Sequence, residues 1–290
     1  MTSDTQTAST EETSFFELRA THNRNRWVLP VVPGITVGPP NMKFLFGGVG
    51  LASAVHALEQ TTGRPLVWAT SQYLSYANPP EIVDVDVIVP KIGKNITQAR
   101  VLGHVQEREI FTVNAAVGSR GKEHDHQWVT MPDVPGPDAC DPMPRFGREK
   151  EEAPDLHQRM NLRVAKGRYG PDRNNKGLSE DGHAVLWARP MNESLPIDAA
   201  MLAVIADFIP SASGHALGKI AGANSLDNTI RIRKIVPTDW VCCDIQIHGI
   251  HDGFVHGDAR LFAQDGTLMA IASQSAILRI WNNFDMRKEA

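Results

Sequence analysis

The chain has 290 residues, a formal net charge of −4, and an ordinary globular composition with 42% hydrophobic and 21% charged residues. This length favours about two domains, and the charge argues against a general nucleic-acid binder, which needs concentrated lysine and arginine. Residues 1–14 are polar and low in complexity, so we expect a disordered tail and no secretory signal.

No uninterrupted run of about 18 apolar residues occurs, so the sequence predicts no membrane span. The three cysteines, Cys140, Cys242 and Cys243, are too few for a disulfide framework. These two features make a cytoplasmic protein the expectation. They leave open whether the chain forms a homo-oligomer.

The first strongly periodic segment predicts a helix that starts near Gly47 and ends before Gly63. Its apolar residues recur at helical spacing over 51–58, and Pro65 follows its end. Four strands are then expected, the second of which has valine at every other position. They cover residues 66–74, 82–89, 96–105 and 110–118. The order is one helix followed by an antiparallel meander.

The second half repeats this order. Ile197–Phe208 predicts a helix, which we expect to end at Pro210–Gly214. Strands are expected at residues 226–234, 240–247, 254–263 and 268–280. Between the halves, residues 118–160 are rich in proline, glycine and charge, which is typical of a linker.

The two halves also align with each other. Residues 79–117, moved forward by 158, fall on 237–275 without a gap, and five identities accompany a shared apolar rhythm. The identical pairs are Pro79 and Pro237, Val83 and Val241, Asp86 and Asp244, Ile92 and Ile250, and Gln106 and Gln264. With this offset, Gln274 corresponds to Ala116 and Ser225 to Val67, so two apolar positions of the first copy are polar in the second.

One helix on a curved antiparallel sheet, made twice, predicts an α+β protein with a double hot-dog fold. Joining the two sheets edge to edge gives one continuous pseudo-dimeric sheet and removes an exposed edge from each copy. The expected organisation is a tail at 1–14, an N-terminal hot-dog at 15–120, a linker at 121–160 and a C-terminal hot-dog at 161–290.

Four motifs resemble the acyl-CoA thioesterase II (TesB) family of double hot-dog proteins. They are FLFGG at 44–48, ADFIP at 206–210, SLDNTI at 225–230 and QDGTLMAIASQSAILR at 264–279. The last motif is the most specific of the four. The resemblance covers both halves and leaves out the tail and the linker.

The resemblance implies a catalytic site made of Asp207, Ser225 and Gln274. The family has an aspartate on the second helix, a threonine two residues before a Leu/Ile-Asp pair, and a glutamine on the last strand. Ser225 departs from that threonine, since it keeps the hydroxyl but lacks the methyl group that stiffens χ1. The family's Asp-His pair is Asp227 and Asn228 here.

The implied activity is hydrolysis of fatty acyl-CoA by direct attack of water. Asp207 accepts the water proton, while Ser225 and Gln274 hold the same water. Backbone N–H groups at a helix start suit the developing oxyanion, which makes Gly47 and Gly48 candidate donors. The substrate is then the partner of the protein, and no cofactor or metal is expected.

Two other functions remain as alternatives. A hot-dog enoyl-CoA hydratase would carry a Gly-Asp-x-Asn-Pro-x-His loop, which this sequence lacks. A non-catalytic acyl-CoA binding protein would need the pocket but no working base. Release of free thiol from acyl-CoA separates hydrolysis from binding.

Some polar clusters have a simpler interpretation than a functional site. His248, His251, Asp252 and His256 could hold a metal, but they coincide with a turn of the first copy and predict a solvated hairpin. The basic group Arg231, Arg233 and Lys234 lies beside the expected site strand. It either meets coenzyme A phosphates or forms a solvated strand face.

Overall fold

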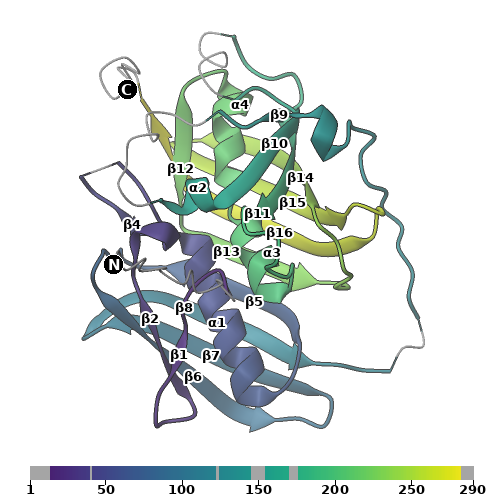
Figure 1. Ribbon diagram of the computed structural model, residues 1–290. Coiled ribbons are helices and arrows are strands. Elements are labelled where there is room, and N and C mark those ends of the chain that lie inside the picture. The colour runs from purple at the N-terminus through teal and green to yellow at the C-terminus, as the bar shows by residue number, and fades with distance from the viewer. Residues whose placement is uncertain (1–13, 40, 122–123, 145–153, 170–175, 282–290) are drawn as a thin grey trace, which may run out of the picture.

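The computed structural model describes residues 14–39, 41–121, 124–144, 154–169 and 176–281. The expected tail therefore lies outside the described residues, except for Ser14. Within these ranges the chain folds as a double hot-dog, in which two helix-and-sheet copies share one long antiparallel sheet (Figure 1).

The first copy wraps a sheet around one helix, α1 (Gly47–Thr62). Five strands lie in the order β2-β6-β7-β8-β5, all antiparallel. They are β2 (Arg26–Pro30), β5 (Leu66–Tyr73), β6 (Ile82–Ile92), β7 (Ile96–Val105) and β8 (Arg108–Gly118). The expected helix and meander are confirmed, while β2 was not predicted.

The second copy repeats the arrangement around α3 (Ala199–Ala206). Its strands lie in the order β13-β16-β15-β14-β11-β10, and β12 also pairs with β16. They are β10 (Met160–Lys166), β11 (His183–Pro190), β12 (Ala221–Ser225), β13 (Asp227–Ile232), β14 (Val241–His251), β15 (Phe254–Ala263) and β16 (Leu268–Ile280). The sequence did not predict β10, β11 or β12.

The copies join where β5 pairs with β13. Asn228 lies opposite Ser71 and Thr229 opposite Thr70, and the two threonine hydroxyls are 2.7 Å apart. Each strand is thereby an interior strand of one sheet, because the edge that each copy would otherwise expose is paired. The sheet is continuous, as the sequence predicted.

Short elements complete the fold at the edges. They are β1 (Arg19–Ala20), β3 (Thr36–Val37), β4 (Phe44–Leu45), β9 (Asp141–Pro142) and α2 (Leu156–Arg159). β1 pairs with β2 at one end of the long sheet and β9 pairs with β10 at the other, while β3 and β4 form a separate pair.

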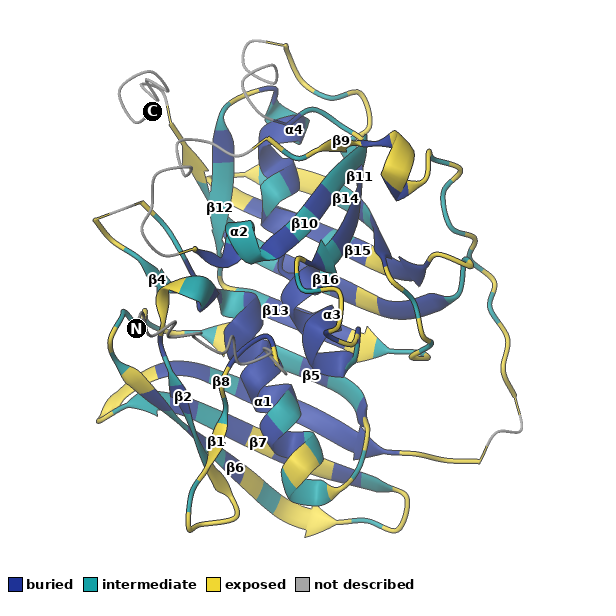
Figure 2. Ribbon diagram, viewed as in Figure 1, coloured by how far each residue is buried: buried dark blue, intermediate teal, exposed yellow. Residues whose placement is uncertain are grey.

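The helices α1 and α3 pack against each other on the concave side of the sheet, and both are largely buried (Figure 2). By length and composition, the helical stretch Ala199–Leu217 could cross a membrane, but 83% of it is buried inside the protein. A core helix passes the same test, because it too must be apolar on all sides.

The expected end of the second helix is confirmed, since α3 stops at Ala206, ahead of Pro210. After α3 the chain continues as a 3₁₀ turn (Ile209–Ala212) and as α4 (Ser213–Leu217), and it stops at Gly218 with φ 61°. Proline removes a donor and breaks the α-helix, yet it is tolerated in the first turn of a new helical segment. Pro210 therefore lies in the first turn of the 3₁₀ segment that follows α3.

The offset between the copies is also not constant. Ala99 on β7 pairs with Ala115 on β8, and the equivalent residue Gly257 on β15 pairs with Gln274 on β16. Equivalent residues are therefore 158 positions apart on β7 and β15, but 159 positions apart on β8 and β16. The second hairpin has one more residue in its turn. Gln274 therefore corresponds to Ala115, and by the same register Ser225 corresponds to Leu66. Both counterparts remain apolar.

The segment expected as a linker makes specific contacts with the outer face of the second copy. Val129, Met131 and Val134 pack on a buried cluster that includes Trp187, and the indole Nε1–H donates to the Pro135 carbonyl at 2.8 Å. This cluster lies on the face of the sheet opposite α3, so the segment shields apolar side chains that would otherwise face water.

Candidate active site

Asp207 lies at the C-terminal end of α3, where the helix breaks. Its backbone N–H still bonds to the last turn, and its side chain is 5% exposed. A helix C-terminus is a poor place for a negative charge, because the unpaired carbonyls point that way. The position therefore costs stability and needs compensating donors.

Three donors converge on the Asp207 carboxylate. Ser225, the last residue of β12, donates its hydroxyl to Oδ1 at 3.0 Å, and Gln274 Nε2 donates to the same oxygen. Gln274 Nε2 is also 3.2 Å from Ser225 Oγ. The structure thus brings together all three residues predicted from the sequence, from a helix end, a strand end and a strand middle.

Local irregularity of the sheet positions these groups. At Gln274, the neighbour of β16 changes from β13 to β12, and Leu226 between them donates its N–H to the Ser275 carbonyl at 2.8 Å. Gln274 lies on the concave face of β16, among buried alanines such as Ala272 and Ala276. Small neighbours leave room for a long polar side chain under the helix break.

The third donor comes from the first copy. The Gly48 N–H, in the first turn of α1, donates to Asp207 Oδ2 at 2.6 Å. A Cβ at Gly48 would lie 2.8 Å from Asp207 Cβ and 2.9 Å from the Val204 carbonyl oxygen, so the glycine permits this close approach of α1 and α3. The expectation that Gly48 serves the oxyanion needs correction, because its N–H already holds the carboxylate.

Burial raises the pKa of Asp207 from 3.8 to about 6, although the bonds from Gln274, Ser225 and Gly48 lower it. The desolvation cost of the charge exceeds the gain from three donors and from the N-terminus of α1. A carboxylate with a pKa near 6 is ionised at neutral pH and is a stronger base than a free aspartate. Such a group is suited to proton abstraction.

A second polar group lies beside the first and was not predicted. Ser71 and Tyr73 on β5 and Asn228 on β13 have buried side-chain polar atoms without a hydrogen-bond partner in the described part of the chain, as does Gln274 Oε1. A sequence signal existed, since Ser71 and Tyr73 share the strand face of buried Ala69, where a core residue is expected.

The other clusters considered in the sequence lie elsewhere. His248 bonds to Asp258 and His256 to Ser275 on the exposed β14–β15 hairpin. Over the described ranges, no group of three or more His, Cys, Asp or Glu side chains could hold a metal ion. Arg233 and Lys234 both bond to Asp125, each at 2.7 Å.

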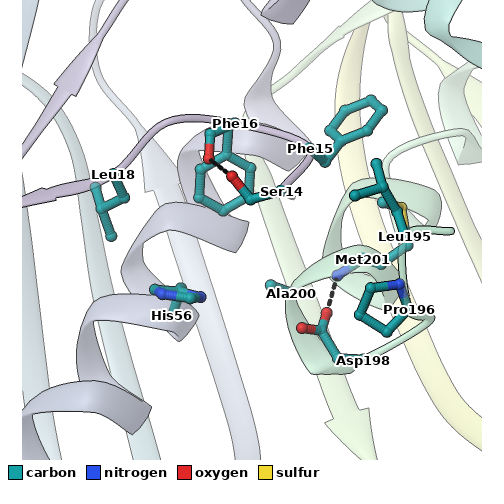
Figure 3. A pocket seen from close by; sticks show the side chains of 10 residues that line it. All are labelled: Ser14, Phe15, Phe16, Leu18, His56, Leu195, Pro196, Asp198, Ala200 and Met201. Atoms are coloured by element: carbon teal, nitrogen blue, oxygen red, sulfur yellow. Dashed lines mark hydrogen bonds between the residues drawn. The ribbon is translucent and has the colours of Figure 1, made fainter. Parts of the chain in front are cut away.

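A cavity of about 160 Å³ lies at the other end of the two helices (Figure 3). Its lining comes from the segment before β1, from α1 and from the start of α3, and includes Phe16, His56 and Met201. Asp198 caps α3 there by accepting the Met201 N–H at 2.8 Å. None of the three predicted catalytic residues lines this cavity.

Comparison with known proteins identifies the family to which this chain belongs. The model for the acyl-CoA thioesterase C-terminal domain matches residues 137–278. A Novosphingobium aromaticivorans protein assigned as a thioesterase is 34% identical, over 90% of this chain and 98% of its own, with a TM-score of 0.77. No curated protein sequence matches this chain.

Two more distant structures share the fold. The TesB protein of Mycobacterium avium subspecies paratuberculosis is 16% identical over 91% of this chain and 96% of its own, with a TM-score of 0.71. The acyl-CoA thioesterase II TesB2 of Mycobacterium marinum is 19% identical over 92% and 98%, with a TM-score of 0.69. The fold and these similarities define a thioester hydrolase with a double hot-dog fold. The chain belongs to the acyl-CoA thioesterase family.

Proposed function

We propose that this enzyme hydrolyses fatty acyl-CoA to free fatty acid and coenzyme A, with Asp207, Ser225 and Gln274 as the groups that act on water. The observation that carries the proposal is the convergence of Ser225 and Gln274 on one carboxylate oxygen in a buried position. The pKa of Asp207, raised to about 6 by burial, supports the role of a base.

The remaining bonding capacity of the three groups suits one water molecule. Asp207 Oδ2 accepts one bond from Gly48 and has a second lone pair for a water proton. Gln274 directs Nε2 at Asp207, which leaves Oε1 as a buried acceptor that has no partner among the described residues. A water held by these oxygens is oriented before it attacks, and a fixed attacking geometry is a large part of the rate gain.

The hydrolysis needs no covalent bond between the enzyme and its substrate. Water oxygen bonds to the thioester carbon while its proton moves to Asp207, and the carbonyl electrons move onto oxygen. When the tetrahedral intermediate collapses, the carbon–sulfur bond breaks and the thiolate takes the proton from Asp207. The products are the fatty acid and the free thiol of coenzyme A.

A non-catalytic acyl-CoA binding protein is the second candidate. Serine in place of the family threonine favours it, since Ser225 is free to adopt more rotamers. Against it stands the ordered geometry of Ser225, whose hydroxyl donates to Asp207 and accepts from Gln274. The hydratase alternative has no such support, because its motif is missing from the sequence.

A thiol-release assay over acyl-CoA chain lengths tests the proposal, with purified wild type and Asp207→Asn compared at each length. We expect release by wild type at pH 8 and loss of most of it in the variant. Absence of release from every acyl-CoA, with binding retained, would favour the binding protein.

A further inference from the structure

Beside Asp207 lies a cluster of buried polar atoms that the mechanism above does not use. Tyr73 Oη, Ser71 Oγ and both amide atoms of Asn228 have no hydrogen-bond partner among the described residues. A buried polar group without a partner costs free energy, and native proteins keep few of them. Several in one place point to a bound molecule that supplies the partners.

Tyr73 is the member of this cluster that reaches the catalytic carboxylate. The position that a Cβ would take at Gly47 is 2.9 Å from Asp207 Oδ2, 2.9 Å from Tyr73 Cζ and 3.2 Å from Tyr73 Oη, so both oxygens lie against this glycine. The negative charge of Asp207 also reaches the phenol. After burial, which is the larger cause, it helps to raise the pKa of Tyr73 well above its ordinary value.

Both oxygens therefore lie at the start of α1. Gly47 is the first residue of this helix, so its N–H has no partner within the helix. The Gly48 N–H is already bound to Asp207. The described geometry therefore offers two donors near the Asp207 carboxylate, namely the Tyr73 hydroxyl and the Gly47 N–H.

We propose that Tyr73 is a further catalytic residue, whose hydroxyl donates a hydrogen bond to the thioester carbonyl oxygen together with the Gly47 N–H. This inference rests on the proposed function. As water attacks the carbonyl carbon, the carbonyl electrons move onto this oxygen, and the two donors stabilise the charge that develops. The phenol keeps its proton throughout, and Asp207 alone carries the water proton to the leaving thiolate.

Ser71 and Asn228 complete the arrangement as positioning residues. They face each other across the pair of strands that joins the two copies, and Ser71 lies two residues before Tyr73 on the same strand face. Both side chains lie against the phenol and act to lower its pKa, while burial and the charge of Asp207 raise it. They limit the rotation of the ring and leave its hydroxyl free for substrate.

Tyr73→Phe tests the proposal, because it removes only the hydroxyl. We expect kcat to fall by about 10²–10³-fold, the usual loss for one oxyanion donor. The melting temperature should stay equal or rise, because an unpaired buried hydroxyl is removed. The matched control is Tyr76→Phe, which changes an exposed tyrosine three residues away whose hydroxyl accepts from Asn224 at 2.8 Å.

A pair of analogues separates this role from a merely structural one. A ketone analogue of acyl-CoA, with methylene in place of sulfur, keeps the carbonyl oxygen, whereas S-alkyl-CoA lacks it. Wild type and Tyr76→Phe should bind the ketone more tightly, and Tyr73→Phe should lose that preference. The ratio of the two dissociation constants does not depend on the fraction of folded protein.

An unchanged kcat, or an unchanged preference for the ketone, would overturn the role of Tyr73. Failure of the proposed function gives a different result, in which wild type releases no thiol from any acyl-CoA. The analogue preference would still report on the hydroxyl in that case.

Discussion

The two copies of the fold have the same arrangement of strands around a helix, yet the three groups predicted to act on water, Asp207, Ser225 and Gln274, all lie in the second copy. Where β16 has Gln274, the first copy has Ala115, and where β12 ends at Ser225, the first copy has Leu66. The helices differ as well, since α1 is continuous over 16 residues whereas its counterpart breaks at Asp207.

The difference teaches that the first copy supports the site without being one. It contributes the start of α1, where Gly48 binds the carboxylate, and the end of β5, where Tyr73 lies. A broken helix leaves backbone groups unpaired and costs stability, which one copy can bear if the other remains regular. We therefore expect one working site in each chain.

The largest expected effect comes from Asp207→Asn, which removes the base and keeps the shape. Turnover should fall by about 10²–10⁴-fold, the usual contribution of general base catalysis. The measurement is initial thiol release at saturating acyl-CoA and pH 8. Full activity in a folded variant would rule out Asp207 as the base.

The free energy of unfolding of the Asp207→Asn variant should also differ from that of wild type in its dependence on pH. Because the folded pKa of Asp207 is raised to about 6 from 3.8, wild type loses stability as pH rises through that interval, by about 3 kcal/mol at most. Asp207→Asn should not show this loss. The free energy of unfolding of the variant, relative to that of wild type, should therefore be higher at pH 8 than at pH 4. Chemical denaturation at pH 4 and 8 gives both values.

Gln274→Ala makes β16 resemble β8 at the equivalent position. We expect kcat to fall by about 10²-fold, because the water loses one of its two holding groups. Binding of a non-hydrolysable acyl-CoA analogue should change little, since the lost contact is to water and matters most in the transition state. Active-site titration should find one site per chain. Two sites per chain, or a loss of binding as large as the loss of kcat, would contradict the proposed difference between the two copies.

Ser225→Ala removes the hydroxyl, and Ser225→Thr adds the missing methyl group. The alanine variant should lose about tenfold in kcat, as expected for one hydrogen bond to a charged group. Because the Ser225 bond lowers the pKa of Asp207, its loss should also move the acid limb of kcat/KM above the wild-type value near 6. The threonine variant should equal or exceed wild type, and an alanine variant matching wild type would show that the hydroxyl is not used.

Ala115→Gln places the glutamine of the second copy in the first. It should create no second site, since Leu66 offers no hydroxyl and α1 has no break. Turnover and titrated sites per chain should stay unchanged, while the free energy of unfolding falls by about 1–3 kcal/mol, because a buried amide is left without partners. A second titratable site would show that the hydroxyl of Ser225 and the helix break at Asp207 are not required for a site.

Much of the fold was predictable because the relevant signals are local. The alternation at Val83, Val85 and Val87 marks a strand with one buried face, and all three valines are buried in the structure. The helix that ends at Gly63 has its left-handed cap there, with φ 65°. Strands β2, β10 and β11 were missed because they lie before each helix, where the sequence comparison between the copies did not reach.

The candidate site was predictable only through the resemblance to a family. By themselves, Asp207, Ser225 and Gln274 are a helix end, a loop residue and a polar residue in an apolar strand. Their spacing in the chain gives no reason to bring them together. Tyr73 was missed because the sequence around it is that of an ordinary buried strand, and what distinguishes it is the position of its buried hydroxyl beside Asp207.

The sequence by itself determined the two copies, their helix and strands, and the polar substitutions that distinguish the second copy. It did so because periodicity, turns and caps depend on neighbours a few residues apart. The tertiary structure decided the one-residue shift between β8 and β16, the short helical segments that follow α3, and the assignment of the Gly48 N–H to Asp207. These depend on register and on the close approach of α1 and α3, which are set by packing between segments about 150 residues apart in the chain.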